Sequence, residues 1–413
     1  MSTYYVSNKG CDTNDGLSPE KAFATVIKLR EVLKGGDTVL LHCGDTFYGQ
    51  IKLPAGISPE QPTSVGSYGE GAKPTLSQYK IANADAWEQV SEKVYKLDLT
   101  DITKFTGNTS EINTNVGFLK VSNKIFPHKI FELEKLAAQW DFYNDDQYVF
   151  VYSEKNPSEL SDDIRFACQI GCIPFTTHMK VENIIIRGTG AHGINGVSNG
   201  AYIYNCEFHE IGGSELHGFP TPNTRYGNGV ECWANSANIT VDHCKFSGVY
   251  DVAITMQGRP VKTSWTNMYF TNNIMWNNQH CFEIWSSGDV PDTGFVDCHF
   301  ENNLCIESGY GWSYAVRPDK TASTHLLLYG IGCPLCDITV TGNTFVNARN
   351  MTVFKAGGVC QMPKDYKIFG NTIICPEGQP LAWKDKTSDE EFDAYIKKLE
   401  EDNTVYRHTV FTL

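Results

Sequence analysis

From about residue 180 onward, the hydrophobic and polar positions of the chain follow one short repeating pattern. An apolar residue is followed by two residues, then Cys or Asn, then one residue and a second apolar residue. The pattern occurs as IYNCEF (203–208), VDHCKF (241–246), FTNNIM (270–275), FVDCHF (295–300), VTGNTF (340–345) and IFGNTI (368–373). Short β-type segments repeated at a variable spacing are typical of a parallel coil, in which insertions loop out of single turns.

The Cys or Asn of this pattern predicts one stacked column at a bend of the coil. Its members are Cys206, Cys244, Asn273, Cys298, Asn343 and Asn371. Successive turns lie roughly 4.8 Å apart, so an Asn amide can bond the residues above and below it. Cys suits the same place because it is small and tolerates burial. The interchange favours buried thiols over disulfides among the 14 cysteines, and thiols favour a reducing cytoplasm.

The first residues predict the start of the coil. Residues 1–84 are expected to form an N-terminal cap and the first coils. A strand and a Gly/Asp loop precede a helix from about Pro19 to Lys34, whose apolar residues recur at helical spacing. The segment GDTVLLHCG follows as the first coil strand. Such a helix would cover the open end of the coil, where strand edges are otherwise exposed.

The repeat is interrupted once and ends in a helix. Residues 85–165 are β-rich without the repeat and are expected to form an insertion packed against the coil. Residues 166–380 form the body of the coil and contain the candidate site. Residues 381–413 are expected to form a C-terminal helix and tail, with Ser388 and Glu391 as a capping box at the helix start.

The opening segment (residues 4–49) and the Asn/Cys repeat together resemble the right-handed parallel β-helix proteins, the pectate-lyase-like superfamily. The resemblance covers most of the chain. It implies an all-β fold, a single-stranded right-handed parallel β-helix, and action on carbohydrate as a lyase, hydrolase, epimerase or tailspike. The polygalacturonase set of NTD, paired Asp-Asp, GHG and RIK is not found, and neither is the Asp cluster with which pectate lyases bind calcium. No catalytic residue of the family is therefore transferred, since fold alone does not determine function.

Two segments of the body, YGNGVECW (226–233) and HCFEIW (280–285), each place a glutamate two residues before a tryptophan. Aligning the strands that follow each bend predicts one outward column of Glu231, Ile254, Glu283, Arg317 and Val353. The next outward column is then Trp233, Met256 and Trp285. Residues that alternate with these are mostly apolar and face the interior of the coil.

This stacking predicts a catalytic group of three carboxylates, namely Glu231, Glu283 and Asp251. The two glutamates would lie two turns apart, about 9–10 Å between backbones, with Asp251 entering from the intermediate turn. Inverting glycosidases hold their carboxyls about 6.5–9.5 Å apart and retaining ones about 5–5.5 Å apart, so the former geometry is favoured. Carboxylates this close must differ in pKa, with one held protonated as an acid.

The surrounding residues suit a sugar ligand. Flat aromatic faces and polar groups are expected to form the substrate-binding set, which comprises Trp233, Trp285, Trp312, Tyr226, Arg225, His217, His280, Arg317 and Gln257. The loop 212–229 interrupts the coil beside the carboxylates and is expected to enclose the substrate. The sequence therefore favours a glycoside hydrolase acting on an oligosaccharide or polysaccharide.

Two other functions stay open. A polysaccharide lyase acting by β-elimination needs a base beside a uronate and a group that neutralises the uronate carboxylate, for which Arg317, Lys355 and His280 are candidates. The acidic column opposes this function. The second is a non-catalytic carbohydrate-binding β-helix, although the trimerisation tail of a tailspike is not found.

Each signal also has a plainer interpretation. Glu231 and Glu283 are also compatible with solvated strand charges balanced by Arg317. The two tryptophans are compatible with a hydrophobic ladder, and His280 and His192 with bonds that hold a turn.

Charge and composition narrow the partners. The net charge of −14 disfavours nucleic acid and anionic membranes at long range. No apolar run of 18 or more residues is present, and the start has no basic or apolar signal region. We expect a cytoplasmic protein, or a secreted one if a signal peptide was removed, without cofactor. Cys333 and Cys336 give a C-x-x-C spacing without two further ligands, so no metal is expected. The oligomeric state is not predicted.

Overall fold

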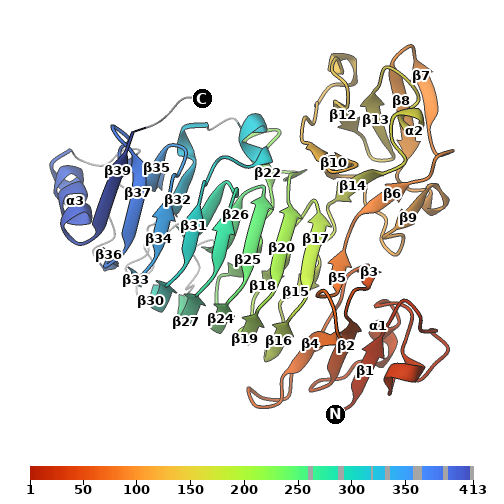
Figure 1. The fold of residues 1–413 in the computed structure, drawn as a ribbon, viewed down its shortest axis with the longest axis horizontal. Helices are drawn as coiled ribbons and strands as arrows, with labels where there is room; N and C mark the ends of the chain where they lie inside the picture. Colours follow the sequence, from red (N-terminus) through yellow and green to blue (C-terminus); the bar gives the residue numbers. More distant parts are fainter. Residues whose placement is uncertain are drawn as a thin grey trace.

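The computed structural model describes residues 1–258, 264–286, 293–317, 320–330, 335–356, 365–384 and 389–409. Its dominant feature is a coil whose turns run along the long axis of the molecule, with an inserted β-rich unit above the N-terminal turns (Figure 1). Strands of successive turns pair in parallel, as Cys232 with Met256 and Met256 with Ile284 illustrate. The predicted parallel β-helix is therefore confirmed.

Three parallel sheets form the walls of this coil. The first contains, in order, β1 (Thr3–Val6), β2 (Thr38–His42), β4 (Thr63–Tyr68), β16 (Met179–Glu182), β19 (Asn199–Tyr204), β24 (Ala237–Asp242), β27 (Ser264–Thr271), β30 (Gly294–Glu301), β33 (Leu335–Thr341) and β36 (Tyr366–Phe369). The second contains β3 (Thr46–Tyr48), β5 (Thr75–Ser77), β17 (Ile185–Thr189), β20 (Glu207–Ile211), β25 (Lys245–Val249), β28 (Ile274–Trp276), β31 (Leu304–Ile306), β34 (Thr344–Val346), β37 (Thr372–Pro376) and β39 (Thr404–His408). The third, the site sheet, contains β15 (Ile173–Pro174), β18 (Ile194–Gly196), β23 (Val230–Trp233), β26 (Val252–Gly258), β29 (His280–Ser286), β32 (Thr324–Tyr329), β35 (Met351–Ala356) and β38 (Ala382–Lys384).

A ladder of buried amides runs along one bend, as the repeat predicts, but one of its members differs. Asn303, and not Cys298, follows Asn273 in the column. The backbone N–H of Asn273 donates to Oδ1 of Asn303 at 2.9 Å, and the N–H of Asn303 donates to Asn343 at 2.8 Å. Cys298 lies instead within β30, paired with Met268. The segment FVDCHF matches the pattern by chance, because two outward-facing residues, Val296 and Asp297, follow Phe295 within β30.

The predicted continuous helix from Pro19 to Lys34 is wrong. Only a 3-10 turn, Pro19–Lys21, and the single helical turn α1 (Leu29–Val32) are helical. Between them Phe23 forms a parallel bridge with Val6 of β1, and bends follow it. Helical spacing of the apolar residues was overridden here by a strand edge that offers hydrogen bonds. The segment still covers the end of the coil, because its apolar side chains lie in the main core.

The inserted unit contains two antiparallel sheets and its own hydrophobic core. One sheet has the order β11 (Lys124–Phe126), β10 (Val116–Val121), β14 (Ile164–Cys168), β6 (Lys80–Ala82) and β9 (Phe105–Gly107). The other has the order β12 (Phe142–Asn144), β13 (Tyr148–Tyr152), β8 (Val94–Asp98) and β7 (Glu88–Ser91). Its helical turns are Ile102–Lys104, Leu133–Lys135 and α2 (Pro157–Leu160).

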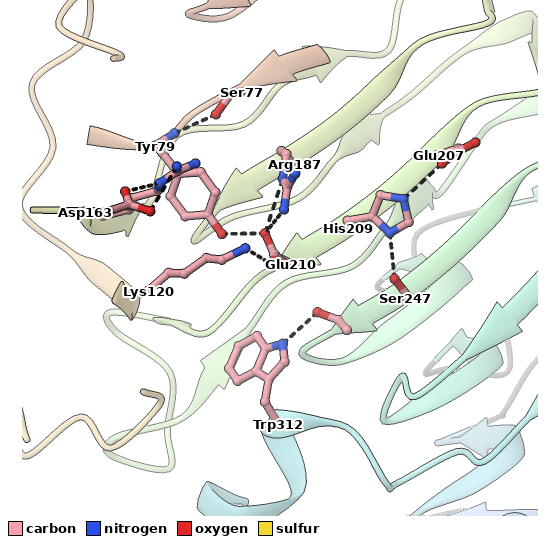
Figure 2. A network of polar contacts seen from close by, with 12 residues as sticks. Ser77, Tyr79, Lys120, Asp163, Arg187, Glu207, His209, Glu210, Ser247 and Trp312 are labelled. Carbon is pink, nitrogen blue, oxygen red and sulfur yellow. Dashed lines mark hydrogen bonds and ion pairs between the residues drawn. The ribbon is translucent and has the colours of Figure 1, made fainter. Parts of the chain in front are cut away.

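Glu210 fastens the insertion to the coil (Figure 2). Arg187 donates to its carboxylate from the neighbouring coil strand at 2.6 Å, and Tyr79 Oη donates at 2.8 Å. Lys120 of β10 completes the network with an ion pair to the same carboxylate. Burial alone would raise the pKa of Glu210, but the two cations hold it at about 2. The insertion is therefore held to the outer face of the second sheet by ionised contacts.

The C-terminal helix is confirmed as α3 (Asp389–Glu401), which packs on the last turns through Phe392 and Leu399. The capping residue Ser388 lies outside the described residues. Two further 3-10 turns, Trp312–Val316 and Lys320–Ala322, precede β32. The 12 cysteines that the structure describes are free thiols, and most are buried, so the expectation of buried thiols holds for that part of the chain.

Candidate active site

The site sheet brings Glu231 and Glu283 onto one outward ladder, with Thr255 between them. Glu231 pairs in register with Thr255, and Thr255 with Glu283. The predicted stacking of the two glutamates is therefore present, whereas the intermediate residue is Thr255 and not Ile254. Gly229 forms the bend just before β23. The alignment of β23 with β26 differs by one position from the predicted alignment.

The same ladder continues through Leu327 and Phe354, which replace the predicted Arg317 and Val353. Arg317 does not lie on a strand of this sheet. It directly follows the 3-10 turn Trp312–Val316. The predicted alignment is wrong here because the chain makes a helical turn before the next strand. The outward ladder therefore contains Leu327 where Arg317 was predicted.

Glu231 is buried among polar side chains, with only 4% of its surface exposed. Its Oε2 lies 2.7 Å from Nδ1 of His192 and accepts a bond from Asn228 Nδ2 at 3.1 Å. Gln257, two residues beyond Thr255, also bonds this carboxylate. Burial raises the pKa of Glu231, but His192 and these hydrogen bonds outweigh it and lower the pKa below its ordinary value. Glu231 is therefore an ionised carboxylate.

Glu283 lies in the opposite electrostatic situation. It is 8% exposed, and its Oε2 accepts one bond from Thr255 Oγ1 at 2.9 Å. Burial, together with the nearby charges of Asp251 and Glu231, raises its pKa to about 8, against the opposing effects of Thr255 and Arg317. At neutral pH Glu283 therefore carries a proton.

Asp251 stands beside this pair at the start of β26. Its backbone N–H donates to Gly227 O at 3.1 Å, and its Oδ1 lies 3.0 Å from Nη1 of Arg317. The Arg317 guanidinium also lies over the Tyr250 ring, with 5.3 Å between its central carbon and the ring centroid. Asp251 is thus held by a cation while its own charge acts on Glu283.

An outward row of aromatic and amide side chains lies next to the carboxylate ladder. Trp233 pairs in register with Gln257, Gln257 with Trp285, and Trp285 with Tyr329. The rings of Trp233 and Trp285 are 6.4 Å apart between centroids, as are those of Trp285 and Tyr329. Met256, predicted in this row, points inward and is fully buried. Partly exposed rings spaced beside a row of polar groups can bind the apolar faces of sugars.

The loop that was expected to enclose substrate forms the coil hairpin, residues 214–226, with strands β21 (Ser214–Glu215) and β22 (Arg225–Tyr226). Arg225 does not reach the carboxylates, because its guanidinium is buried and bonds carbonyl oxygens of Gly213, Gly117 and Pro127. The predicted binding residue is thus a tether between the hairpin and the insertion.

Tyr226 lies near Glu231. Its ring centroid is 5.0 Å from that of His192, and its Oη accepts a bond from Gln169 Nε2 at 2.6 Å. His217, at the other end of the hairpin, has a side chain that is 67% exposed. The hairpin therefore offers one predicted binding residue to the carboxylates and places another away from them.

Of the remaining two predicted binding residues, Trp312 is partly buried and His280 is buried. Trp312 donates from Nε1 to Gly248 O at 2.8 Å and packs on Phe118 of the insertion. His280 begins β29 with 1% of its surface exposed. Trp312 therefore supports the junction of coil and insertion, whereas His280 lies within the site sheet between Val252 and Thr324.

Sequence reasoning gave His192 only a turn-forming role and did not single out Asn228 or Thr255. The signal was present in the pair AHGIN (191–195) and GNGVE (227–231), which align residue by residue across one turn of the coil. That alignment places Asn195 beside Glu231, as the structure does, and puts His192 beside Asn228. The His192 imidazole and the Asn228 amide, which come from successive turns of the coil, thus contact the same carboxylate of Glu231.

No group of three or more His, Cys, Asp or Glu side chains that could hold a metal ion occurs among the described residues. Cys333 of the C-x-x-C spacing lies outside them. Within the same part of the chain, no helix is both long and apolar enough to cross a membrane.

No family model matches this chain, and no curated protein matches it. Its fold is similar to several solved structures. One, described as the complex of XylC with xylose, is 12% identical and covers 98% of this chain and 82% of its own, with a TM-score of 0.47. A rhamnogalacturonan lyase is 11% identical, with coverages of 100% and 90% and a TM-score of 0.46. The GH136 lacto-N-biosidase from Eubacterium ramulus is 11% identical, with coverages of 99% and 68% and a TM-score of 0.41. The likeness concerns the fold, and the activity has to be argued from the site.

Proposed function

We propose that this protein is a glycoside hydrolase in which Glu283 is the general acid and Glu231 the general base. The supporting observation is a pair of buried carboxyls on one ladder whose different surroundings shift their pKa values in opposite directions. Pairs of titratable groups whose pKa values are driven apart are the usual basis of acid–base catalysis near neutral pH. A solvated pair of strand charges would be neither buried nor separated in this way.

The reaction needs one proton delivered and one removed. Glu283 gives its proton to the glycosidic oxygen as the bond from that oxygen to the anomeric carbon breaks. A water molecule bonds to the anomeric carbon from the opposite face, and Glu231 takes the proton that the water loses. One glycosidic bond and one water are consumed, and the two carboxyls exchange protonation states. Burial and the charge of Asp251, which Arg317 fixes in place, raise the pKa of Glu283 and keep it protonated before the reaction.

The spacing of the two carboxyls favours inversion of the anomeric centre. Two turns of coil separate their backbones by roughly 9–10 Å. Both side chains bond the turn between them, Glu283 through Thr255 and Glu231 through Gln257. Inverting enzymes hold their two carboxyls about 6.5–9.5 Å apart, which leaves room for a water, so the proposal assigns this pair to the inverting class.

The test is a screen of the purified protein on aryl glycosides and on neutral and uronate-containing oligosaccharides, with reducing ends and ultraviolet absorbance both recorded. We expect new reducing ends without an unsaturated product. Glu283→Gln and Glu231→Gln should each reduce kcat at least a hundredfold, the usual contribution of a general acid or base. Proton NMR of the first product formed should show the inverted anomer.

A matched control is Glu182→Gln. Glu182 ends β16 on the first sheet and forms a surface ion pair with Lys180 at 2.8 Å. This variant should retain full activity. Turnover that survives both Glu283→Gln and Glu231→Gln would exclude the proposed roles, and binding without turnover on every substrate would favour a carbohydrate-binding protein.

A polysaccharide lyase is the second candidate, and the placement of His192 beside Tyr226 favours it. An imidazole and a phenol within 5.0 Å between ring centroids are groups that can remove and return a proton. The screen separates the two functions, because β-elimination yields an unsaturated, ultraviolet-absorbing product and consumes no water. For a lyase, His192→Ala or Tyr226→Phe would abolish turnover on a uronate polymer.

A further inference from the structure

A polar cavity of about 320 Å³ opens where the insertion meets the coil hairpin. The insertion contributes Asn115, Lys129 and residues 143–146 to its lining, and the hairpin contributes Glu215 and His217. Ligand pockets generally begin near 300 Å³, so the space suits a small polar molecule. Neither the carboxylate ladder nor the aromatic row contributes a lining residue.

Lys129 gives this cavity a built donor. The side chain is 93% buried, and its Nζ donates to Asn115 Oδ1 at 2.9 Å. That amide is the one hydrogen-bond acceptor that Nζ has among the described residues. Burial, together with the nearby charge of Arg225, lowers the pKa of Lys129 to about 7. The ammonium carries three N–H groups and the neutral amine two, so either form keeps at least one donor for an acceptor that enters the cavity. A buried polar group with unused bonding capacity is costly unless a ligand or water completes it.

The charges around this donor select the acceptor. Three acidic residues, Glu215, Asp145 and Asp146, line the cavity together with Lys129 and the exposed His217. The buried Arg225 lies near enough to act on Lys129, so three acidic side chains face two basic ones and His217. A uronate or another anion would meet this excess of negative charge, whereas sugar hydroxyls and amide carbonyls accept from Nζ without that repulsion. The Tyr143 ring in the same lining adds an apolar face.

The cavity is joined to the candidate active site through a short series of contacts. Asn115 Nδ2 donates to Glu215 O at 2.8 Å, and Gln169 N donates to Asn115 O at 2.9 Å. Gln169 in turn bonds Tyr226, which lies beside the pocket of Glu231. The two places therefore share the coil hairpin, whose Glu215 lines the cavity and whose Tyr226 lies beside His192.

We propose that the cavity at Lys129 is a distal subsite that binds one neutral sugar residue of the substrate. This inference rests on the proposed function, because it takes the bound sugar to be part of the substrate. Binding of a sugar in the cavity does not itself depend on turnover. The subsite would give the enzyme a preference for neutral chains long enough to pass the coil hairpin. Uronates would be rejected there.

The test measures binding without catalysis. Glucose, galactose, xylose, N-acetylglucosamine and glucuronate are titrated by ligand-observed NMR into the Glu283→Gln protein, alone and combined with Lys129→Met. We expect at least one neutral sugar to bind, glucuronate not to bind, and Lys129→Met to weaken the neutral sugar at least tenfold. Met keeps the length and apolar stem of Lys, and a thermal melt checks its folding.

A second variant keeps the inference testable if Lys129→Met does not fold. Asp146 is exposed and lines the cavity, so Asp146→Lys reverses a charge without touching the core. It should make glucuronate binding detectable and change neutral-sugar affinity less than threefold. Asp145 is avoided because its Oδ1 accepts two backbone bonds of a turn.

The outcomes separate this inference from the proposed function. Failure of every neutral sugar to bind, equal affinity in Lys129→Met, or unchanged rejection of glucuronate by Asp146→Lys would each overturn the subsite. Sugar binding that depends on Lys129 in a protein that hydrolyses nothing would keep the subsite and reject the hydrolase.

Discussion

Replacing Glu283 with Gln should stabilise the protein while it removes the catalytic proton. Glu283 is buried beside Asp251 and Glu231, and these surroundings raise its pKa from an ordinary value of 4.5 to about 8. In the unfolded chain the same carboxyl is ionised at neutral pH. Folding must therefore return a proton to it, and Gln, which is neutral in both states, removes that requirement.

The magnitude follows from the separation of the two pKa values. Because the folded pKa is raised, the stability associated with this proton is fully present below pH 4.5 and is lost as pH rises through 8. Each pH unit in this window is worth about 1.4 kcal/mol. At pH 7, 2.5 units above the ordinary pKa of Glu283, wild type should be about 3 kcal/mol less stable than Glu283→Gln.

The assay is urea denaturation of both proteins at half-unit intervals from pH 4.5 to 8.5. The difference in unfolding free energy should be small at the acidic end and grow steadily toward pH 8. Glu182→Gln, which changes a partly exposed surface carboxylate, should show no such slope. A Glu283→Gln difference that stays constant between pH 5 and 8 would refute the assigned protonation of Glu283, because an altered packing contact has no proton linkage.

Three further expectations follow from the same structure. As Glu283 ionises, kcat/KM should fall about tenfold per pH unit above roughly pH 8. Asp251→Asn should move this decline to lower pH, because Asp251 raises the pKa of Glu283. An unchanged pH–rate profile in this variant would contradict the effect of Asp251 on Glu283. Asn303→Ala should lower the unfolding free energy by ~2–3 kcal/mol in urea melts, because it leaves the buried N–H of Asn273 without its acceptor; a loss under 0.5 kcal/mol would count against the ladder's role. Trp285→Ala should weaken oligosaccharide binding about tenfold by calorimetry, near the upper worth of one aromatic contact, and unchanged affinity would remove the aromatic row from the site.

Part of the site could be read from the chain because a coil makes local patterns repeat in space. The Glu-x-Trp spacing in YGNGVECW and HCFEIW puts two outward pairs on parallel strands, and the fold needs only stacking to bring them together. Ile254 was predicted in place of Thr255 because the strand VAITMQG has no clear alternation of apolar and polar residues that would separate its inward from its outward positions. Arg317 was misplaced for a related reason, since a 3-10 turn there does not follow the strand pattern.

The sequence by itself determined the coil, the insertion that interrupts it, the terminal helix and the outward stacking of Glu231 with Glu283. Those features depend on periodicity, which the chain carries locally. Tertiary structure alone decided that Glu231 meets His192 and Asn228, that Glu283 meets Asp251, and that Lys129 is buried at a cavity. Protonation and ligand capacity depend on burial and on charges contributed by distant segments, and both quantities exist only after the turns and the insertion have packed.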